Sequence, residues 1–260
     1  MKANVKSVSG NENNKVDLPS VFDEDIRPDI VKRSVHSAQS SRKQPKGSNP
    51  KAGMETTAET PMKGSGRTRV RRVKGSGYHA AGRGAWAPFT EGGRAAHPPK
   101  SEKKIGEDIN KREKEIAIRS AISATKDRKI VEKRGHEIDG VEDFPIIVED
   151  DFEEIEKTRE VKEVFENLGI WRDVERVKNG KKIRAGKGKY RGRKYKKRVG
   201  PLLVVSEDSG IFRGARNIPG VEITKVDQLN SEMLAPGGVL GRLTVWTSSA
   251  IDEIEGRFSN

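Results

Sequence analysis

Residues 63–84 read KGSGRTRVRRVKGSGYHAAGRG and form the centre of a longer stretch, residues 42–100, that cannot build a hydrophobic core. The longer stretch has no Ile or Leu and only two Val, while Gly occurs ten times. It carries thirteen Lys and Arg against three Glu. Ordering such a chain costs roughly 1–2 kcal/mol per residue in backbone entropy, with no apolar burial to offset it. We therefore expect a partner to order residues 42–100, or the stretch to stay disordered.

Three aromatic side chains, Tyr78, Trp86 and Phe89, are spaced through this basic stretch. Cations interleaved with planar rings suit a polyanion that also offers flat faces for stacking, as folded RNA does. The alternative is a solvated, disordered linker. The position of the stretch favours RNA binding, because it is a long excursion between two predicted helices of one fold.

A second basic stretch, residues 178–198, contains twelve Lys and Arg and no acidic residue. The two stretches together carry a net charge of +22 in a chain whose total is +13, so the remaining residues carry −9. Uniform basicity is explained by solubility alone. This segregation instead predicts an acidic body with two anion-binding appendages.

The rest of the chain alternates between predicted helices and strands, which indicates an α/β fold with a mostly parallel sheet flanked by helices. The globular domain comprises residues 1–41 and 101–260, residues 42–100 are a long extended insertion, and residues 178–198 are a second basic loop within the domain. Apolar positions repeating every three to four residues predict helices at residues 30–41, 110–125 and 158–168, and a last helix after residue 248. Apolar runs predict strands at residues 3–8, 15–18, 144–148, 170–177, 202–205, 221–223 and 243–246.

Local signals place the ends of these helices. Asn110 with Glu113, and Ser249 with Asp252, have the spacing of capping boxes. Gly169 is expected to end the helix over residues 158–168 at the C′ position.

The composition argues against several classes of protein. The chain has no Cys, only short apolar runs and no apolar leader after Met1, so we expect a cytoplasmic protein with no membrane partner. Gly77 and Gly82 have phosphate-loop spacing, but no Lys-Ser or Lys-Thr pair follows. The four His lack metal-ligand spacing, and nothing assembles a nucleophile, a base and an oxyanion donor. We therefore expect no catalytic residue, no metal and no cofactor.

Several motifs resemble the large-subunit ribosomal protein L4 family, in its archaeal and eukaryotic branch. In the first basic stretch they are Gly75-Ser76-Gly77-Tyr78-His79, Gly82-Arg83-Gly84-Ala85 and Ala96-His97-Pro98-Pro99. In the second half they are Lys182-Ile183-Arg184-Ala185-Gly186, Arg216-Asn217-Ile218-Pro219-Gly220, Leu234-Ala235-Pro236-Gly237-Gly238 and Gly241-Arg242-Leu243. Because the sequence stops soon after the last predicted helix, we expect the archaeal form.

The resemblance implies a structural, non-catalytic constituent of the large ribosomal subunit that binds 23S rRNA and assists subunit assembly. Its insertion is expected to thread through rRNA and line the polypeptide exit tunnel, with neighbouring ribosomal proteins and the nascent polypeptide as further partners. The implied tunnel tip comprises Arg71, Arg72, Val73, Lys74, Gly75, Ser76 and Gly77. The implied rRNA contacts in the insertion are Arg67, Arg69, Arg71, Arg72, Lys74, Tyr78, His79, Arg83, Trp86 and Arg94.

The second basic stretch is interpreted as a phosphate clamp on another rRNA helix, because its cations have no acidic partners. Its expected contacts are Lys181, Lys182, Arg184, Lys187, Lys189, Arg191, Arg193, Lys194, Lys196, Lys197 and Arg198. Two alternatives stay open. One is an α/β enzyme that acts on RNA and uses the basic loops as substrate guides, and the other is a general nucleic-acid-binding protein.

Overall fold

The computed structural model describes residues 2–258, which divide into two compact units. The larger unit comprises Met1–Gln39 and Glu107–Asn260, and the smaller comprises Ser40–Gly106. The predicted insertion, residues 42–100, falls inside the smaller unit. The predicted second basic loop, residues 178–198, falls inside the larger one.

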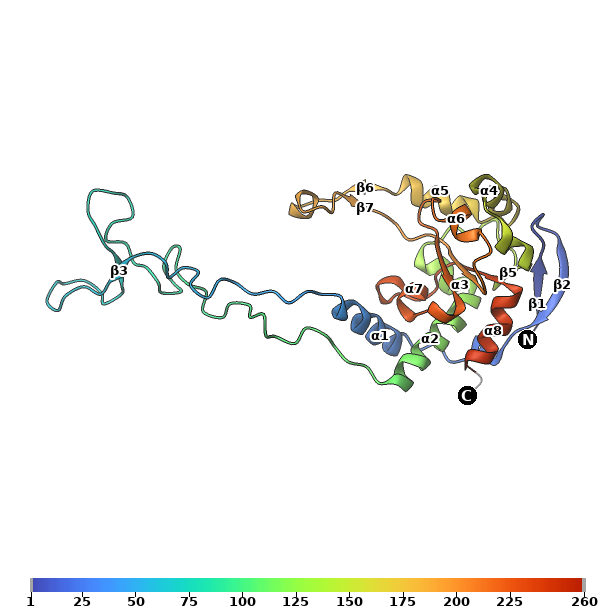
Figure 1. The fold of residues 1–260 in the computed structure, drawn as a ribbon, viewed down its shortest axis with the longest axis horizontal. Coiled ribbons are helices and arrows are strands. Elements are labelled where there is room, and N and C mark those ends of the chain that lie inside the picture. The colour runs from blue at the N-terminus through green and yellow to red at the C-terminus, as the bar shows by residue number, and fades with distance from the viewer. Residues whose placement is uncertain (1, 259–260) are drawn as a thin grey trace. The chain divides into compact units, whose positions relative to one another are not determined.

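A six-stranded sheet forms the centre of the larger unit (Figure 1). Its strand order is β2-β1-β5-β10-β8-β9. The strands are β1 Lys2–Lys6, β2 Glu12–Asp17, β5 Ile146–Val148, β8 Leu202–Val205, β9 Glu222–Lys225 and β10 Thr244–Thr247. Every pair in the sheet is parallel except β1 with β2, an antiparallel hairpin at one edge. The predicted mostly parallel α/β sheet is confirmed.

The central strands are buried on both faces, which explains why their sequences are continuous apolar runs rather than alternating ones. Ile147, Leu202, Val204 and Trp246 point to one core. Neighbouring residues on the same strands, among them Leu203, point to the other core. Two hydrophobic layers therefore fix the register of these strands, because a shift by one residue would exchange the two sets of side chains.

Helices cover both faces of the sheet (Figure 1). Buried side chains of α1 Pro28–Ser41, α2 Lys111–Lys126, α7 Ser231–Leu234 and α8 Ser248–Phe258 join the first core. Those of α3 Arg128–Arg134, α4 Thr158–Asn167, α5 Trp171–Asn179 and α6 Ile211–Ala215 join the second. Among residues 2–258, no helix has the length and apolar character needed to cross a bilayer.

The prediction of a strand at residues 170–177 is wrong, because this segment is α5. Ile170, Val174 and Val177 are buried and recur at intervals of four and three residues, which is the period of a helix face. The chain enters α5 directly from α4 through a Schellman turn at Gly169, whose φ is +74°. The amide of Gly169 donates to Glu166 and the amide of Ile170 to Phe165. The predicted role of Gly169 is thus confirmed.

Both predicted capping boxes are wrong. Asn110 precedes α2 but its side chain makes no capping hydrogen bond. At α8 the helix already begins at Ser248, and the Ser249 amide donates to Asp150 Oδ1 at 2.8 Å. A carboxylate 99 residues away in sequence therefore caps this helix, and no local pattern indicates it.

The smaller unit has almost no core of its own. Of its residues, only Ala85 has a buried hydrophobic side chain. Its regular structure consists of β3 Ala58–Glu59 paired with β4 Arg72–Val73, and an isolated bridge between Arg72 and Gly84.

Candidate nucleic-acid interface

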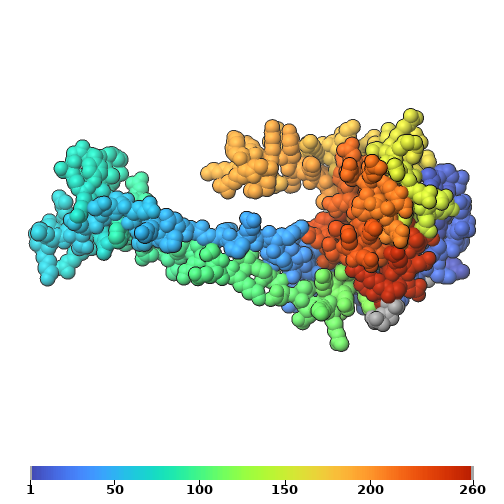
Figure 2. All heavy atoms as spheres, in the orientation of Figure 1, coloured from blue at the N-terminus to red at the C-terminus, as the bar shows by residue number. Residues whose placement is uncertain are grey.

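The second basic stretch forms a hairpin on the larger unit, and Figure 2 shows it in light orange, projecting from the surface of that unit. Its strands are β6 Lys182–Ile183 and β7 Tyr195–Lys196. One further backbone hydrogen bond, from the Arg184 amide to the Lys194 carbonyl at 2.8 Å, extends the ladder. Glycines with positive φ, Gly186 and Gly192, shape the turn at its end. The hairpin thus presents a narrow backbone with side chains on every side.

Like charges meet directly across this hairpin. Lys182 lies opposite Lys196 in the antiparallel pair, an arrangement that is unfavourable for two cations. The Tyr195 ring contacts two other cations of the hairpin, with its centroid 4.5 Å from Lys181 Nζ and 5.6 Å from Lys194 Nζ. Residues 178–198 supply no carboxylate. An anion from outside the chain would relieve the repulsion.

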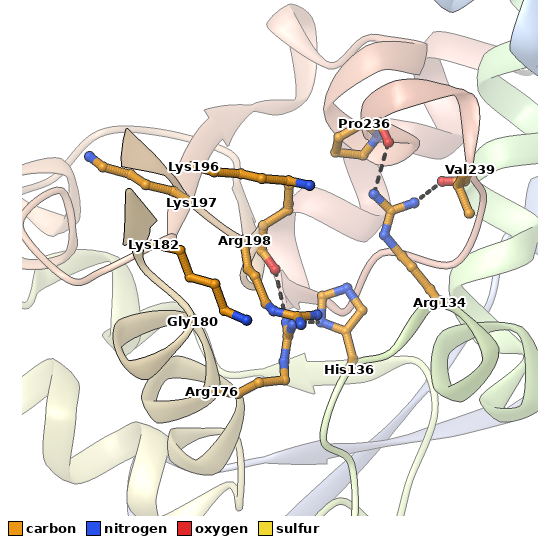
Figure 3. A pocket seen from close by; sticks show the side chains of 11 residues that line it. Arg134, His136, Arg176, Gly180, Lys182, Lys196, Lys197, Arg198, Pro236 and Val239 are labelled. Atoms are coloured by element: carbon orange, nitrogen blue, oxygen red, sulfur yellow. Dashed lines mark hydrogen bonds between the residues drawn. The ribbon is translucent and has the colours of Figure 1, made fainter. Parts of the chain in front are cut away.

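A basic pocket of about 430 Å³ lies where the hairpin joins the rest of its unit (Figure 3). The hairpin and its C-terminal strand contribute Lys182, Lys196, Lys197 and Arg198, while α3 and α5 contribute Arg134 and Arg176. The remaining lining residues are His136, Gly180, Val199, Pro236 and Val239. No acidic side chain lines this cavity. The segments that lead into β8 and β10 form part of its wall, so it lies near the amino ends of these parallel strands.

His136, Asp173 and Arg176 form a buried group beneath the pocket. The Asp173 side chain is fully buried and lies 3.0 Å from His136 Nδ1 and 2.8 Å from Arg176 Nε. It also accepts the Glu137 amide at 3.0 Å. Arg176 Nη2 donates to the Val199 carbonyl at 2.9 Å. One carboxylate therefore orients both a histidine ring and a guanidinium group at the cavity wall.

The surroundings set the charge of each group. Burial raises the pKa of Asp173, but the hydrogen bonds from His136 and Arg176 outweigh it and hold that pKa below its usual value. Burial lowers the pKa of His136 despite the neighbouring carboxylate. Burial, together with the charges of Arg242 and Arg176, lowers the pKa of Arg134 to about 10. At pH 7 cationic arginines and a neutral imidazole thus line the pocket, and an ionised Asp173 lies beneath it.

Backbone carbonyls hold Arg134 and Arg242 in place. Arg134 donates to the carbonyls of Pro236, at 3.0 Å, and of Val239. Arg242 is fully buried and donates to Gly200 at 3.0 Å, to Met233 at 2.8 Å and to the Glu222 carboxylate at 2.6 Å. These two arginines tie the segment containing the Leu234–Gly238 motif to the start of β8 and to the end of α3. The motif residues are therefore structural supports of the pocket.

The structure brings together only some of the contacts predicted in the second basic stretch. Lys182, Lys196, Lys197 and Arg198 line the pocket. Arg184 and Lys189 are half-buried in the hairpin, and the other predicted residues are exposed outside the pocket: Lys181, Lys187, Arg191, Arg193 and Lys194. Arg134, His136 and Arg176 were not predicted. Arg134 and His136 lie at the end of α3 and just after it, and Arg176 lies on α5, so no motif or charge run indicates them together.

The predicted residues of the insertion lie in a locally hydrogen-bonded segment. The Val73 amide donates to Arg83, at 2.9 Å, and the Ala85 amide to Arg71, at 2.8 Å. Gly75 and Gly77 have positive φ within the predicted tip, and the Tyr78 hydroxyl donates to the Lys74 carbonyl. These bonds join backbone segments without a surrounding core.

Not all predicted contacts in the insertion are free. Trp86, at φ +67°, donates to the Thr56 carbonyl at 2.7 Å, and the Arg71 guanidinium lies 4.2 Å from its ring centroid. Arg72 donates to the Gly82 carbonyl at 2.8 Å and is half-buried. The other eight predicted residues have exposed side chains: Arg67, Arg69, Arg71, Lys74, Tyr78, His79, Arg83 and Arg94. Their contact with rRNA stays a prediction.

The carboxyl ends of the parallel strands lie at the opposite end of the sheet from the pocket. α/β enzymes usually bind their ligands outside these ends. There the buried Glu153 accepts hydrogen bonds from Thr247 Oγ1 at 2.6 Å and from the amides of Ser206 and Glu207, at 2.9 and 3.1 Å. This carboxylate joins the ends of β8 and β10. Residues 2–258 contain no group of three or more side chains suited to hold a metal ion.

Comparisons with known proteins extend over nearly the whole chain. Residues 16–257 match the model of the ribosomal protein L4/L1 family. The chain is 50% identical over 258 residues to a protein of Methanocaldococcus jannaschii, covering 99% of this chain and 100% of that protein. It is 46% identical over 253 residues to a protein of Methanosphaera stadtmanae, covering 97% and 96% of the two chains. Both relatives bear the name large ribosomal subunit protein uL4.

Proposed function

Because the chain belongs to the ribosomal protein L4/L1 family, we propose that it is a structural constituent of the large ribosomal subunit, in the cytoplasm, where it binds 23S rRNA and assists subunit assembly. The archaeal relatives named large ribosomal subunit protein uL4 support the archaeal form of this assignment. Its partners in this proposal are rRNA, neighbouring large-subunit proteins and the nascent polypeptide.

The observation that carries the proposal is the separation of fold from charge. The larger unit has its own core on both faces of a sheet. The two basic stretches, residues 42–100 and 178–198, contain thirteen and twelve Lys and Arg but only Ala85 as a buried hydrophobic residue. Lys74 and Arg83 pair with Glu59 and Glu91. Many of the other cations have exposed side chains that do not support the core, and such side chains are available to neutralise phosphates.

The insertion is proposed to thread through rRNA and to line the exit tunnel with residues 71–77. Half of its 59 residues span at most about 90 Å when fully extended at about 3.3 Å per residue. Exposed arginines such as Arg67, Arg69 and Arg94 match phosphate pairs through their forked donors. Exposed Tyr78 offers a ring for stacking.

Deletion of residues 67–94 tests this proposal. The larger unit contributes all but one of the buried hydrophobic residues, so we expect the variant to keep a cooperative thermal transition. Large subunits assembled with it should be defective, and their density maps should show an altered tunnel. Normal subunits with an unchanged tunnel would contradict the proposed role of the insertion.

The alternative, an enzyme that acts on RNA, finds one supporting observation in the His136–Asp173 pair, which resembles a base with its orienting carboxylate. The pair lies among cations and near the amino ends of β8 and β10, whereas α/β enzymes usually bind ligands outside the carboxyl ends of the strands. Incubation of labelled RNA with purified protein and divalent metal distinguishes the two functions. The structural role predicts intact RNA, whereas turnover would establish the enzyme.

A further inference from the structure

One polar atom at the wall of the basic pocket has no partner within the protein. His136 is only 6% exposed, and its Nδ1 is paired with Asp173. Among residues 2–258, none forms a hydrogen bond with Nε2 of this ring. Figure 3 shows that nitrogen facing the open space between Arg198 and Arg134. Because this nitrogen faces the cavity and has no partner in the protein, a group supplied from outside can bind it (Figure 3).

The chemistry of Nε2 follows from its neighbours. The ionised Asp173 carboxylate, 3.0 Å from Nδ1, requires the proton on Nδ1. Arg176 Nη2 lies 3.4 Å from the same nitrogen, but its shorter bond, at 2.9 Å, goes to the Val199 carbonyl. Burial lowers the pKa of His136, so the ring is neutral at pH 7. Nε2 is therefore a hydrogen-bond acceptor, and its missing partner is a donor.

The rest of the pocket requires the opposite kind of group. Lys182 and Lys196 oppose each other across the hairpin, and Arg198 adds a third positive charge. The aliphatic part of the Arg198 side chain packs against Gly180. A Cβ added to Gly180 would lie only 2.9 Å from Arg198 Cδ. The ligand must thus be anionic toward the hairpin and carry a donor toward His136. A DNA backbone offers only the first of these features, whereas RNA places a 2′-hydroxyl beside each phosphate.

We propose that this pocket binds one ribose–phosphate unit of an RNA strand, in which Lys182, Lys196 and Arg198 hold the phosphate and His136 Nε2 accepts a hydrogen bond from the 2′-hydroxyl group. Asp173 is a positioning residue in this arrangement, because it fixes the tautomer of the ring. This inference rests on the proposed rRNA binding and adds a point at which the protein distinguishes RNA from DNA.

The test compares the affinities of the full chain for RNA, 2′-O-methyl RNA and DNA oligonucleotides of one sequence at fixed salt concentration. The wild-type protein should prefer RNA over both analogues, since neither carries the donor hydrogen. His136→Leu removes the acceptor and should reduce the preference on the order of fivefold, the value of one hydrogen bond. His136→Gln keeps an acceptor oxygen near the position of Nε2 and should restore part of it. The matched control is His36→Ala, an exposed histidine on α1 of the same unit.

The outcomes separate the inference from the proposed function. Loss of RNA preference in His136→Leu, with overall RNA affinity largely retained, supports the ribose–phosphate site. If wild-type protein binds RNA but does not discriminate against the analogues, the site is wrong and the proposed rRNA binding stands. Wild-type protein that fails to bind RNA at all contradicts both. An equal affinity of the wild-type protein for all three oligonucleotides would overturn the site even where a variant does not fold.

Discussion

Replacement of Asp173 by Asn should destabilise the larger unit strongly with almost no change in shape. Asp173 is fully buried and accepts hydrogen bonds from His136, Arg176 and the Glu137 amide, at 2.8 to 3.0 Å. Each hydrogen bond to a charged group contributes about 1.5–3 kcal/mol. In the Asn side chain an NH2 group replaces one of the two accepting oxygens, and this donor would face other donors. The Arg176 guanidinium, 14% exposed, would lose its anionic partner. We expect the free energy of unfolding to fall by about 3–5 kcal/mol.

Thermal and urea unfolding of the purified chain measure this loss. At roughly 2–4 °C per kcal/mol for a domain of this size, Tm should fall by about 6–20 °C. The matched control is Asp151→Asn, an exposed carboxylate that should change the unfolding free energy by less than about 0.5 kcal/mol. A loss below about 1 kcal/mol for Asp173→Asn would refute the argument, because it would mean that the buried group does not depend on the negative charge.

Three further results are expected. In urea unfolding, Gly169→Ala should lower the free energy of unfolding by about 1–3 kcal/mol more than Gly135→Ala. Both glycines have positive φ, but only at Gly169 would the new Cβ lie 2.1 Å from a carbonyl oxygen, that of Gly140. Equal losses would contradict this packing. The folded-state pKa of His136 lies below 6.5, so the unfolded state takes up the proton first as the pH falls. The free energy of unfolding should therefore decline below pH 6.5, by at most about 1.4 kcal/mol per pH unit. An equal decline in His136→Gln would contradict this assignment. In RNA binding, Lys182→Gln with Lys196→Gln should reduce the slope of log K against log salt by about 0.7–0.9 for each lost phosphate contact, and an unchanged slope would place those lysines outside the interface.

The sheet was predictable because its strands carry strong local signals. Leu202–Val205 is a continuous apolar run that is buried on both faces, and such a run has few other stable arrangements. The helix Trp171–Asn179 was mistaken for a strand because it is short, although Ile170, Val174 and Val177 already show helical spacing. The cap of the last helix was not predictable at all, since Asp150 reaches it across the fold.

The interface was predictable as charge but not as geometry. The cationic run of residues 178–198 is visible in the sequence, whereas the pocket beneath it depends on His136 and Asp173, which are 37 residues apart and meet only when α3 and α5 pack on one face of the sheet. Trp86 shows the same limit. The composition around it predicts a ring free to stack on a base, but Arg71 lies over one of its faces.

Hydrogen exchange on the full chain, with and without an rRNA fragment, tests most directly whether RNA orders the basic stretches. The amides of β8 and β10 should exchange slowly in both conditions, because they lie between two cores. The amides of residues 42–100 and 178–198 should exchange quickly in the free protein and become protected when rRNA binds. Slow exchange of these two stretches in the free protein, unchanged by rRNA, would contradict the account.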